Sequence, residues 1–210
     1  MERARLLLVR HGHRRGDAAE RPIMVGQADY PLSSQGWRQA RALVRGLAAE
    51  PIAAAYASPL RRALSTARAA LAGRDVPLHR CAGLLEIDCG AVDGWSVDEV
   101  KARYPERWTA NERQDDDGFR WPGGESYAEL RRRVLAACDA IAARQPGATV
   151  LVVSHAGAVN QVIGHLEGSP AARWELHRPR NCTVTEVLWA AGEGRIVRYD
   201  DDVAGVAEEG

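Results

Sequence analysis

The amino-acid sequence predicts an α/β protein with three layers, in which helices cover both faces of a mostly parallel central sheet. Short apolar runs of strand length alternate along the chain with segments whose apolar residues recur at helical spacing. Parallel strands need such helical connections between them. The chain has 210 residues, of which 46% are hydrophobic and 27% are charged. This length and composition suit one domain, residues 1–210, with a sizeable core.

The first half of the chain contains three strand patterns and two helix patterns. Ser33 or Ser34 suits the N-cap of the first helix, and Ser58-Pro59 places a capping serine and a first-turn proline at the start of the second. The predicted order is a strand at 5–9, a helix at 33–49, a strand at 52–57, a helix at 58–73 and a short extended segment at 76–79.

The second half returns to the same alternation and ends in two strands. Ser126 and Glu129 form a capping box at the start of a long helix. The glycines at 192 and 194 predict a hairpin at the edge of the sheet. The predicted order is a helix at 126–144, a strand at 149–154, a helix at 155–166, strands at 183–189 and 195–199, and a frayed tail at 200–210.

Between the two halves, residues 88–124 lose regular periodicity. The segment is rich in glycine, proline and aspartate, and it carries three of the six tryptophans, Trp95, Trp108 and Trp121. A brief helix is predicted at 96–104. A long aromatic excursion from an α/β domain is more often a binding loop or lid than a linker. The tryptophans are equally consistent with a wall for a sugar, nucleoside or aryl group and with packing of the loop itself.

Charge and cysteine content narrow the functional class. The 28 basic and 28 acidic residues cancel, which argues against nucleic acid and membrane surfaces as partners. No apolar run is long enough to span a membrane, and the first residues lack the pattern of a secretory signal. The four cysteines have neither CxxC spacing nor a metal-finger pattern. We therefore expect free thiols, no metal site and a cytoplasmic location.

Two histidines stand where a predicted strand gives way to a glycine-containing turn. His11 follows the first strand, beside Arg10, and His155 follows the strand at 149–154. Arg62 lies in the first turn of the second helix. In open α/β sheets the carboxyl ends of the strands are where ligands bind. Arginine forks and helix N-termini bind phosphoryl oxygens, and a neutral imidazole can attack phosphorus. The pattern predicts phosphoryl chemistry on a histidine.

Six blocks of sequence, in order, carry a family resemblance. They are Leu8-Val9-Arg10-His11-Gly12, Gly26-Gln27-Ala28-Asp29-Tyr30-Pro31-Leu32-Ser33, Ser58-Pro59-Leu60-Arg61-Arg62-Ala63, Leu85-Glu86-Ile87-Asp88-Cys89-Gly90 with Asp93-Gly94, Pro122-Gly123-Gly124-Glu125-Ser126, and Val153-Ser154-His155-Ala156-Gly157. The resemblance that they carry covers nearly the whole chain, from about residue 6 to residue 189. The sequence resembles the histidine phosphatase superfamily (phosphoglycerate mutase-like), in its branch of small phosphatases.

The resemblance implies a role for each matching residue. His11 is the expected nucleophile, and Glu86 the expected general acid, which protonates the leaving oxygen and later activates water. The phosphoryl oxygens are expected to bind Arg10, Arg62 and His155. A carboxyl shielded by the tryptophan-bearing segment would hold its proton more firmly, as an acid near neutral pH requires. Gly26 and Gln27, with Asp29, are weaker candidates for substrate contact.

The residues after Arg10-His11-Gly12 depart from the family pattern. His13-Arg14-Arg15 replaces the usual Glu-Thr, and Asp17 stands at the usual position of an asparagine that contacts phosphate. Either Asp17 points away from the site, or Arg14 takes over that contact. The acid phosphatase/phytase branch also begins RHGxR, but its acid is an aspartate after the second histidine, where this chain has Ala156. We therefore retain Glu86 as the acid.

Further site candidates are Glu125 and Asn181. Glu125 has two alternative roles: it is a residue of the site, or its charge stabilises a helix N-terminus. Asn181 also has two alternatives: it lines the mouth of the site, or it lies in a surface turn.

The sequence thus predicts a metal-independent phosphomonoesterase, without a cofactor, that acts on a small phosphorylated metabolite as a monomer or homodimer. Two alternatives stay open: a phosphoglycerate mutase-type phosphotransferase, and a non-catalytic module that binds phosphate or a phosphoprotein. The glycolytic mutases of the family usually have further insertions and a C-terminal tail, whereas this chain stops soon after Tyr199. That difference favours the phosphatase. Which phosphomonoester is the substrate is left open.

Overall fold

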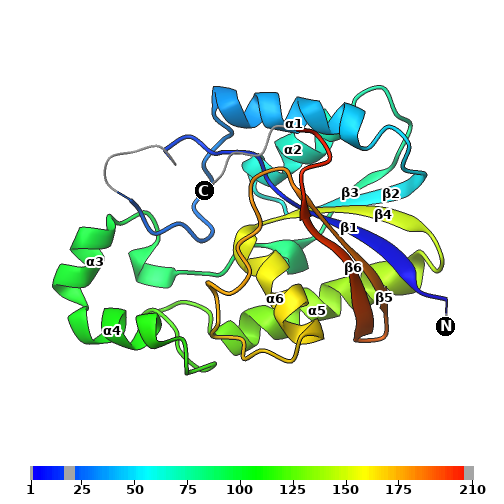
Figure 1. The fold of residues 1–210 in the computed structure, drawn as a ribbon. Helices are drawn as coiled ribbons and strands as arrows, with labels where there is room; N and C mark the ends of the chain where they lie inside the picture. The colour runs from blue at the N-terminus through cyan, green and yellow to red at the C-terminus, as the bar shows by residue number, and fades with distance from the viewer. Residues whose placement is uncertain (1, 17–21, 206–210) are drawn as a thin grey trace.

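The computed structural model describes residues 2–16 and 22–205. Within them, six strands form one sheet in the order β3-β2-β4-β1-β5-β6 (Figure 1). Strands β3, β2, β4 and β1 pair in parallel, and the β5–β6 hairpin joins β1 in antiparallel fashion. The strands are β1 (Ala4–Arg10), β2 (Ile52–Ala57), β3 (Leu78–Arg80), β4 (Thr149–Ser154), β5 (Val184–Ala190) and β6 (Glu193–Asp201).

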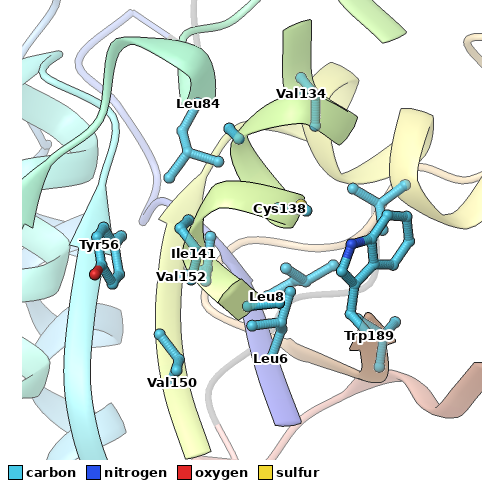
Figure 2. Close-up of a cluster of buried hydrophobic side chains, with 14 of the residues drawn as sticks. Leu6, Leu8, Tyr56, Leu84, Val134, Cys138, Ile141, Val150, Val152 and Trp189 are labelled. Atoms are coloured by element: carbon cyan, nitrogen blue, oxygen red, sulfur yellow. The ribbon is translucent and has the colours of Figure 1, made fainter. Parts of the chain in front are cut away.

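Alternate residues of the central strands enter opposite cores. Leu6 and Leu8 of β1 pack with helices α5 (Tyr127–Arg144) and α6 (Ala156–Leu166) on one face, where Figure 2 shows Trp189 beside them. Leu7 and Val9 pack with α1 (Ser34–Gly46) and α2 (Arg61–Ala70) on the other. Figure 1 shows the resulting layers, with α1 and α2 over one face and α5 and α6 over the other. The predicted fold class is confirmed.

Most helix starts agree with the predicted caps. Ser33 accepts a hydrogen bond from the Gly36 N–H, and Ser126 forms the predicted capping box. The start of α2 was predicted wrongly. Its N-cap is Leu60, and the Ser58 hydroxyl bonds instead to His155 at 2.7 Å. A serine next to a proline predicts a cap only when no stronger partner lies nearby.

The two final strands form the predicted edge hairpin. They are joined by the two-residue turn Ala191-Gly192, whose φ angles are 48° and 75°. Positive φ at both central residues is the geometry of the hairpin turn that matches strand twist. The frayed tail was predicted too early, because Asp200 lies in β6 and accepts hydrogen bonds from Arg180 and Thr183. Residues 206–210 of the predicted tail lie outside the described residues.

Residues 88–124 carry more helix than predicted. Besides the expected helix, α3 (Val97–Arg103), a second one, α4 (Pro105–Arg113), follows directly. A short 3-10 turn stands within the segment at Gly90–Val92, and another precedes it at Ala82–Leu84. Buried aromatic side chains, Phe119, Trp121 and Tyr127, hold the segment against the rest of the protein. In Figure 1, α3 and α4 lie beyond the sheet, at the end where β1 finishes.

Two further properties concern the whole described chain. No helix of residues 2–16 and 22–205 is both long and apolar enough to cross a membrane. The four cysteines are free thiols, as predicted, and three of them are buried.

Candidate active site

The two histidines singled out in the sequence meet at the carboxyl ends of β1 and β4. These strands are parallel neighbours in register, with Arg10 opposite Ser154. His11 and His155 follow directly, and their ring centroids are 5.1 Å apart at an interplanar angle of 62°. The parallel pairing of two strands 144 residues apart therefore builds the centre of the site.

The His11 ring is held in one tautomer. Its Nδ1 lies 2.7 Å from the carbonyl oxygen of Gly12, which can only accept, so Nδ1 carries the proton and Nε2 keeps its lone pair. The backbone of His11 is held on both sides, by Ser154 O at 3.0 Å and by the Asn181 amide at 2.7 Å. Burial, and then the positive charges of Arg62 and Arg10, place the pKa of His11 well below its ordinary 6.5.

Arg62 is a fully buried guanidinium with a rigid cradle. It lies in the first turn of α2 and is 1% exposed. One Nη donates to Ala28 O and the other to Gly26 O, both at 2.7 Å, while Nε donates to His155 Nδ1 at 3.2 Å. Each Nη still has a second N–H. A planar fork fixed in this way can receive two oxygens of one phosphoryl group.

His155 is completely buried and does not face the pocket. Because the Arg62 Nε–H can only donate, His155 Nδ1 accepts, and Nε2 of the neutral ring donates to the Ser58 hydroxyl at 2.7 Å. Burial, and then the charge of Arg62, lower the pKa of His155 well below 6.5. In this arrangement His155 orients Arg62. A direct bond to a phosphoryl oxygen would require exchange of one of these two hydrogen bonds.

Arg10 and Arg14 complete the positive end of the pocket. Both line it together with His11 and Arg62. Arg10 donates to Pro179 O at 2.9 Å, and the Arg14 guanidinium carbon lies 5.4 Å from the centroid of the Tyr30 ring. Asp17, the other departure from the family pattern, lies outside the described residues.

The Glu86 carboxylate lines the same pocket and is 9% exposed. One oxygen accepts from the Gly157 N–H at 3.0 Å, and the other from the Ile87 N–H at 2.9 Å. A Cβ on Gly157 would lie 2.3 Å from Glu86 Oε1. The glycine after His155-Ala156 therefore lets the first turn of α6 contact the carboxylate directly.

Gly26 and Gln27 were expected to contact the substrate, but neither residue lines the pocket. Their predecessors Met24 and Val25 line it instead. The Gly26 carbonyl accepts from Arg62, and the Gln27 side chain donates to the Glu86 carbonyl at 3.1 Å. Both residues therefore act on the site through their neighbours.

The two remaining candidates support the site from outside the pocket lining. Glu125 forms an ion pair with Arg133 at 2.6 Å. Arg133 in turn donates to the backbone carbonyls of Leu85 and Glu86. Asn181 holds the His11 carbonyl. Arg133 stands in a run of three arginines, and no feature of that run distinguishes it as a residue near the site.

Asp93 is a supporting residue whose role the sequence reasoning missed. Its carboxylate accepts the backbone N–H groups of Gly26, Gln27 and Ala28 at 2.9, 2.8 and 2.8 Å. The carbonyls of this same loop hold Arg62. Asp93-Gly94 was among the matching blocks, but nothing in the sequence connects it with residues 67 positions earlier.

These residues surround one end of a pocket of about 320 Å³. That end carries three arginines, one neutral histidine and one carboxylate. The rest of the lining is mainly apolar and aromatic. No three histidine, cysteine, aspartate or glutamate side chains within residues 2–16 and 22–205 gather in a group that could hold a metal ion. The groups present suit an anion with an esterified oxygen near Glu86.

Comparison with known proteins gives a family match and several relatives. The model of the histidine phosphatase superfamily (branch 1) matches residues 6–202. The probable phosphoglycerate mutase GpmB of Yersinia pestis (strain Pestoides F) is 32% identical over 180 residues, 86% of this chain and 82% of that protein. A bifunctional protein of Mycobacterium tuberculosis is 35% identical over 178 residues, 82% of this chain. The chain spans about half, 47%, of the length of that relative.

Solved structures resemble this one over nearly the full chain. The Bacillus stearothermophilus protein YhfR has a TM-score of 0.85 at 27% identity, covering 95% of this chain and 99% of that one. The alpha-ribazole phosphatase from Shigella flexneri has a TM-score of 0.84 at 24% identity, covering 94% and 96%. At 24% identity, the likeness to the Shigella flexneri structure shows a shared fold and nothing further.

Proposed function

This chain belongs to the histidine phosphatase superfamily (branch 1), and on that premise we propose that it is a metal-independent phosphomonoesterase that works through a phosphohistidine at His11. The observation that carries the proposal is the state of the His11 ring. Its Nδ1–H is bonded to Gly12 O, so Nε2 offers a lone pair, and its lowered pKa keeps the ring neutral around pH 7. A neutral, oriented imidazole is the form that attacks phosphorus.

In the first step, Nε2 of His11 forms a bond to phosphorus while the bond from phosphorus to the alcohol oxygen breaks. Glu86 gives its proton to that oxygen, and the alcohol leaves. Arg62, Arg10 and Arg14 neutralise the charge on the remaining phosphoryl oxygens. The bond from Nδ1–H to Gly12 O stabilises the positive charge that the ring acquires.

In the second step, water attacks the phosphohistidine. The Glu86 carboxylate takes a proton from the water, the phosphorus–nitrogen bond breaks, and inorganic phosphate leaves. The lowered pKa makes neutral His11 a good leaving group. His155 serves to orient Arg62 through its Nδ1, and the Ser58 hydroxyl fixes the ring.

Phosphotransfer of the mutase type is the second candidate, because a relative of 32% identity is named a probable phosphoglycerate mutase. A mutase must keep water from the phosphohistidine and return the group to another hydroxyl. Phosphoglycerate also brings a carboxylate, for which the apolar part of the pocket offers little. Hydrolysis of a small phosphate monoester whose alcohol is uncharged therefore has better support.

The test is turnover of an aryl phosphate, together with trapping of the phosphoenzyme as a phosphorus label that is stable in alkali and labile in acid. We expect His11→Ala to lower kcat/KM by more than about 10³-fold, because the covalent step is lost. Arg62→Ala should raise KM strongly, whereas Arg61→Ala, its exposed neighbour, serves as the matched control.

Three results separate the candidates. Phosphate release with a trapped, His11-dependent phosphohistidine supports the phosphatase. Transfer between the two hydroxyls of phosphoglycerate that outpaces phosphate release would establish the mutase. Phosphate binding without turnover or phosphohistidine would establish a non-catalytic binding module and overturn the enzyme proposal.

A further inference from the structure

The pocket continues from the phosphate end into an aromatic chamber that the proposed chemistry does not use. Its walls come from four separate parts of the chain. The lining side chains there are Met24, Trp108, Trp121, Tyr127, Leu130 and Trp174. Trp121, Tyr127 and Leu130 are all less than 8% exposed, yet they border the open space. Apolar surface arranged in this way binds the apolar body of a ligand.

The charges along the pocket are segregated. Arg10, Arg14 and Arg62 all lie at the phosphate end with Glu86. Among the described lining residues, Arg178 is the remaining cation. It is 61% exposed, lies 3.8 Å from Glu175 and sits over the Trp174 ring. The chamber therefore has no buried cation for a second phosphate or a carboxylate.

Asn111 provides one directed polar group in the chamber. The residue is 4% exposed and lines the pocket. Its Oδ1 accepts from the Tyr127 hydroxyl at 2.6 Å, which fixes the amide, while no described residue accepts a hydrogen bond from Nδ2. Trp174 Nε1 donates to the Asn111 backbone carbonyl at 3.4 Å. An amide nitrogen that lines a pocket and has no acceptor among the described residues can donate to an acceptor on a bound ligand.

We propose that the substrate is a monophosphate ester whose alcohol carries one flat, uncharged ring system with a hydrogen-bond acceptor at the end away from the phosphate. The ring packs against Trp108, Trp121 and Trp174, and Asn111 Nδ2 donates to the acceptor. A pocket of about 320 Å³ is at the small end of ligand sites, which suits one ring system rather than a larger conjugate. This inference rests on the proposed phosphatase function.

The test compares primary alkyl phosphates, so that the acidity of the leaving alcohol is nearly constant. We expect kcat/KM for 2-(naphthalen-2-yl)ethyl phosphate to exceed that for ethyl phosphate by about 100-fold, from burial of the ring. 3-Phosphoglycerate should do no better than ethyl phosphate. Trp108→Ala should reduce the naphthyl-to-ethyl ratio by about tenfold or more. A ratio measured on one preparation is insensitive to partial misfolding.

Trp37→Ala is the matched control, because Trp37 is an exposed tryptophan of α1 that also carries an arginine over its ring. It should leave the ratio unchanged. A naphthyl-to-ethyl ratio near one, or a preference for the carboxylate-bearing ester, would overturn the proposal.

The role of Asn111 is tested with quinolinylethyl phosphates, which have the shape of the naphthyl ester and one added ring nitrogen as acceptor. We expect at least one isomer to be preferred over the naphthyl ester by about tenfold in the wild type. Asn111→Leu should abolish that preference. If every isomer is equal to or poorer than the naphthyl ester, the acceptor part of the proposal is wrong.

A binding experiment distinguishes failure of this inference from failure of the proposed function. If no ester is hydrolysed, the phosphatase proposal fails, but 2-(naphthalen-2-yl)ethanol can still be titrated in the presence of inorganic phosphate and followed by tryptophan fluorescence. Saturable binding that is weakened in Trp108→Ala supports the aromatic chamber as a ligand site. Absence of binding overturns it.

Discussion

At the scale of single residues, the position of the Glu86 carboxylate depends on Gly157 having no side chain. The Gly157 N–H and the Glu86 oxygen are 3.0 Å apart, and a Cβ would overlap with the carboxylate. The residue stands in the first turn of α6, so the backbone there is held by the helix. Glu86 would have to move instead.

We therefore expect Gly157→Ala to lower kcat for alkyl phosphates by about 10²-fold. General acid catalysis typically contributes about 10²- to 10⁴-fold, and the expected loss is at the lower limit of that range. p-Nitrophenyl phosphate should lose much less, since its leaving group needs no proton. Steady-state kinetics on both substrates checks this. Gly164→Ala, in the same helix, is the control, because its Cβ would lie 3.0 Å from the end of the Arg131 side chain and 3.8 Å from Ser169 Cβ, without touching Glu86. Equal losses on the two substrates would contradict the role of Glu86.

At the scale of elements, the loop from Gly26 to Ala28 connects Asp93 with Arg62. Asp93 receives the three N–H groups of the loop, and the loop carbonyls receive the two Nη groups of Arg62. Asp29, at the end of the same loop, accepts the Arg61 N–H at the start of α2. The loop thus aligns a helix N-terminus and its guanidinium with the phosphate end of the pocket.

Asp93→Asn should weaken phosphate binding, because an amide presents one acceptor oxygen and turns N–H donors toward the loop N–H groups. We expect the inhibition constant of inorganic phosphate, and KM, to rise by about tenfold, with a smaller change in kcat. A tenfold change is about 1.4 kcal/mol, close to the lower limit for one hydrogen bond to a charged group. Asp88→Asn is the control, since the Asp88 side chain accepts from the Gly90 N–H within its own turn. A parallel fall in kcat with KM unchanged would exclude this positioning role.

At the scale of the whole molecule, the two buried histidines make stability depend on pH. Burial and the nearby arginines lower the pKa of both His11 and His155 well below 6.5. In the unfolded chain each histidine titrates near its ordinary value of about 6.5. Below that pH the unfolded chain binds protons that the folded protein does not, so the folded state loses stability as the pH falls.

The expected slope is up to about 1.4 kcal/mol per pH unit for each histidine, between pH 6.5 and the lowered pKa. Urea unfolding from pH 7.5 to pH 5 measures it. This range stays above the lowered pKa values of Glu50 and Glu186, whose ion pairs with Arg5 weaken only in stronger acid. His11→Asn should remove about half of the slope, and the exposed His79→Asn little of it. A stability that is flat over this range would show that the histidines of the folded protein take up protons as readily as those of the unfolded chain.

The elements and the central residues were predictable because each depends on a short stretch of chain. Apolar runs predicted β1 and β4, and the turn after each predicted that His11 and His155 would stand at their carboxyl ends. Ser33 and Ser126 predicted two helix starts correctly for the same reason. Ser58 misled the prediction because its hydroxyl bonds to a residue 97 positions away.

The fold class and the family could be predicted from the sequence, because periodicity and ordered motifs are properties of the chain. How the residues around His11 are oriented depends on contacts that form in the folded protein. Folding turned His155 toward Arg62 and Ser58 and brought Asp93 under the loop that holds Arg62. It also brought Trp108 and Trp174 into one chamber with Asn111. Hydrogen-bond partners and pocket walls are chosen among groups that meet only after folding, and no spacing along the chain records that choice.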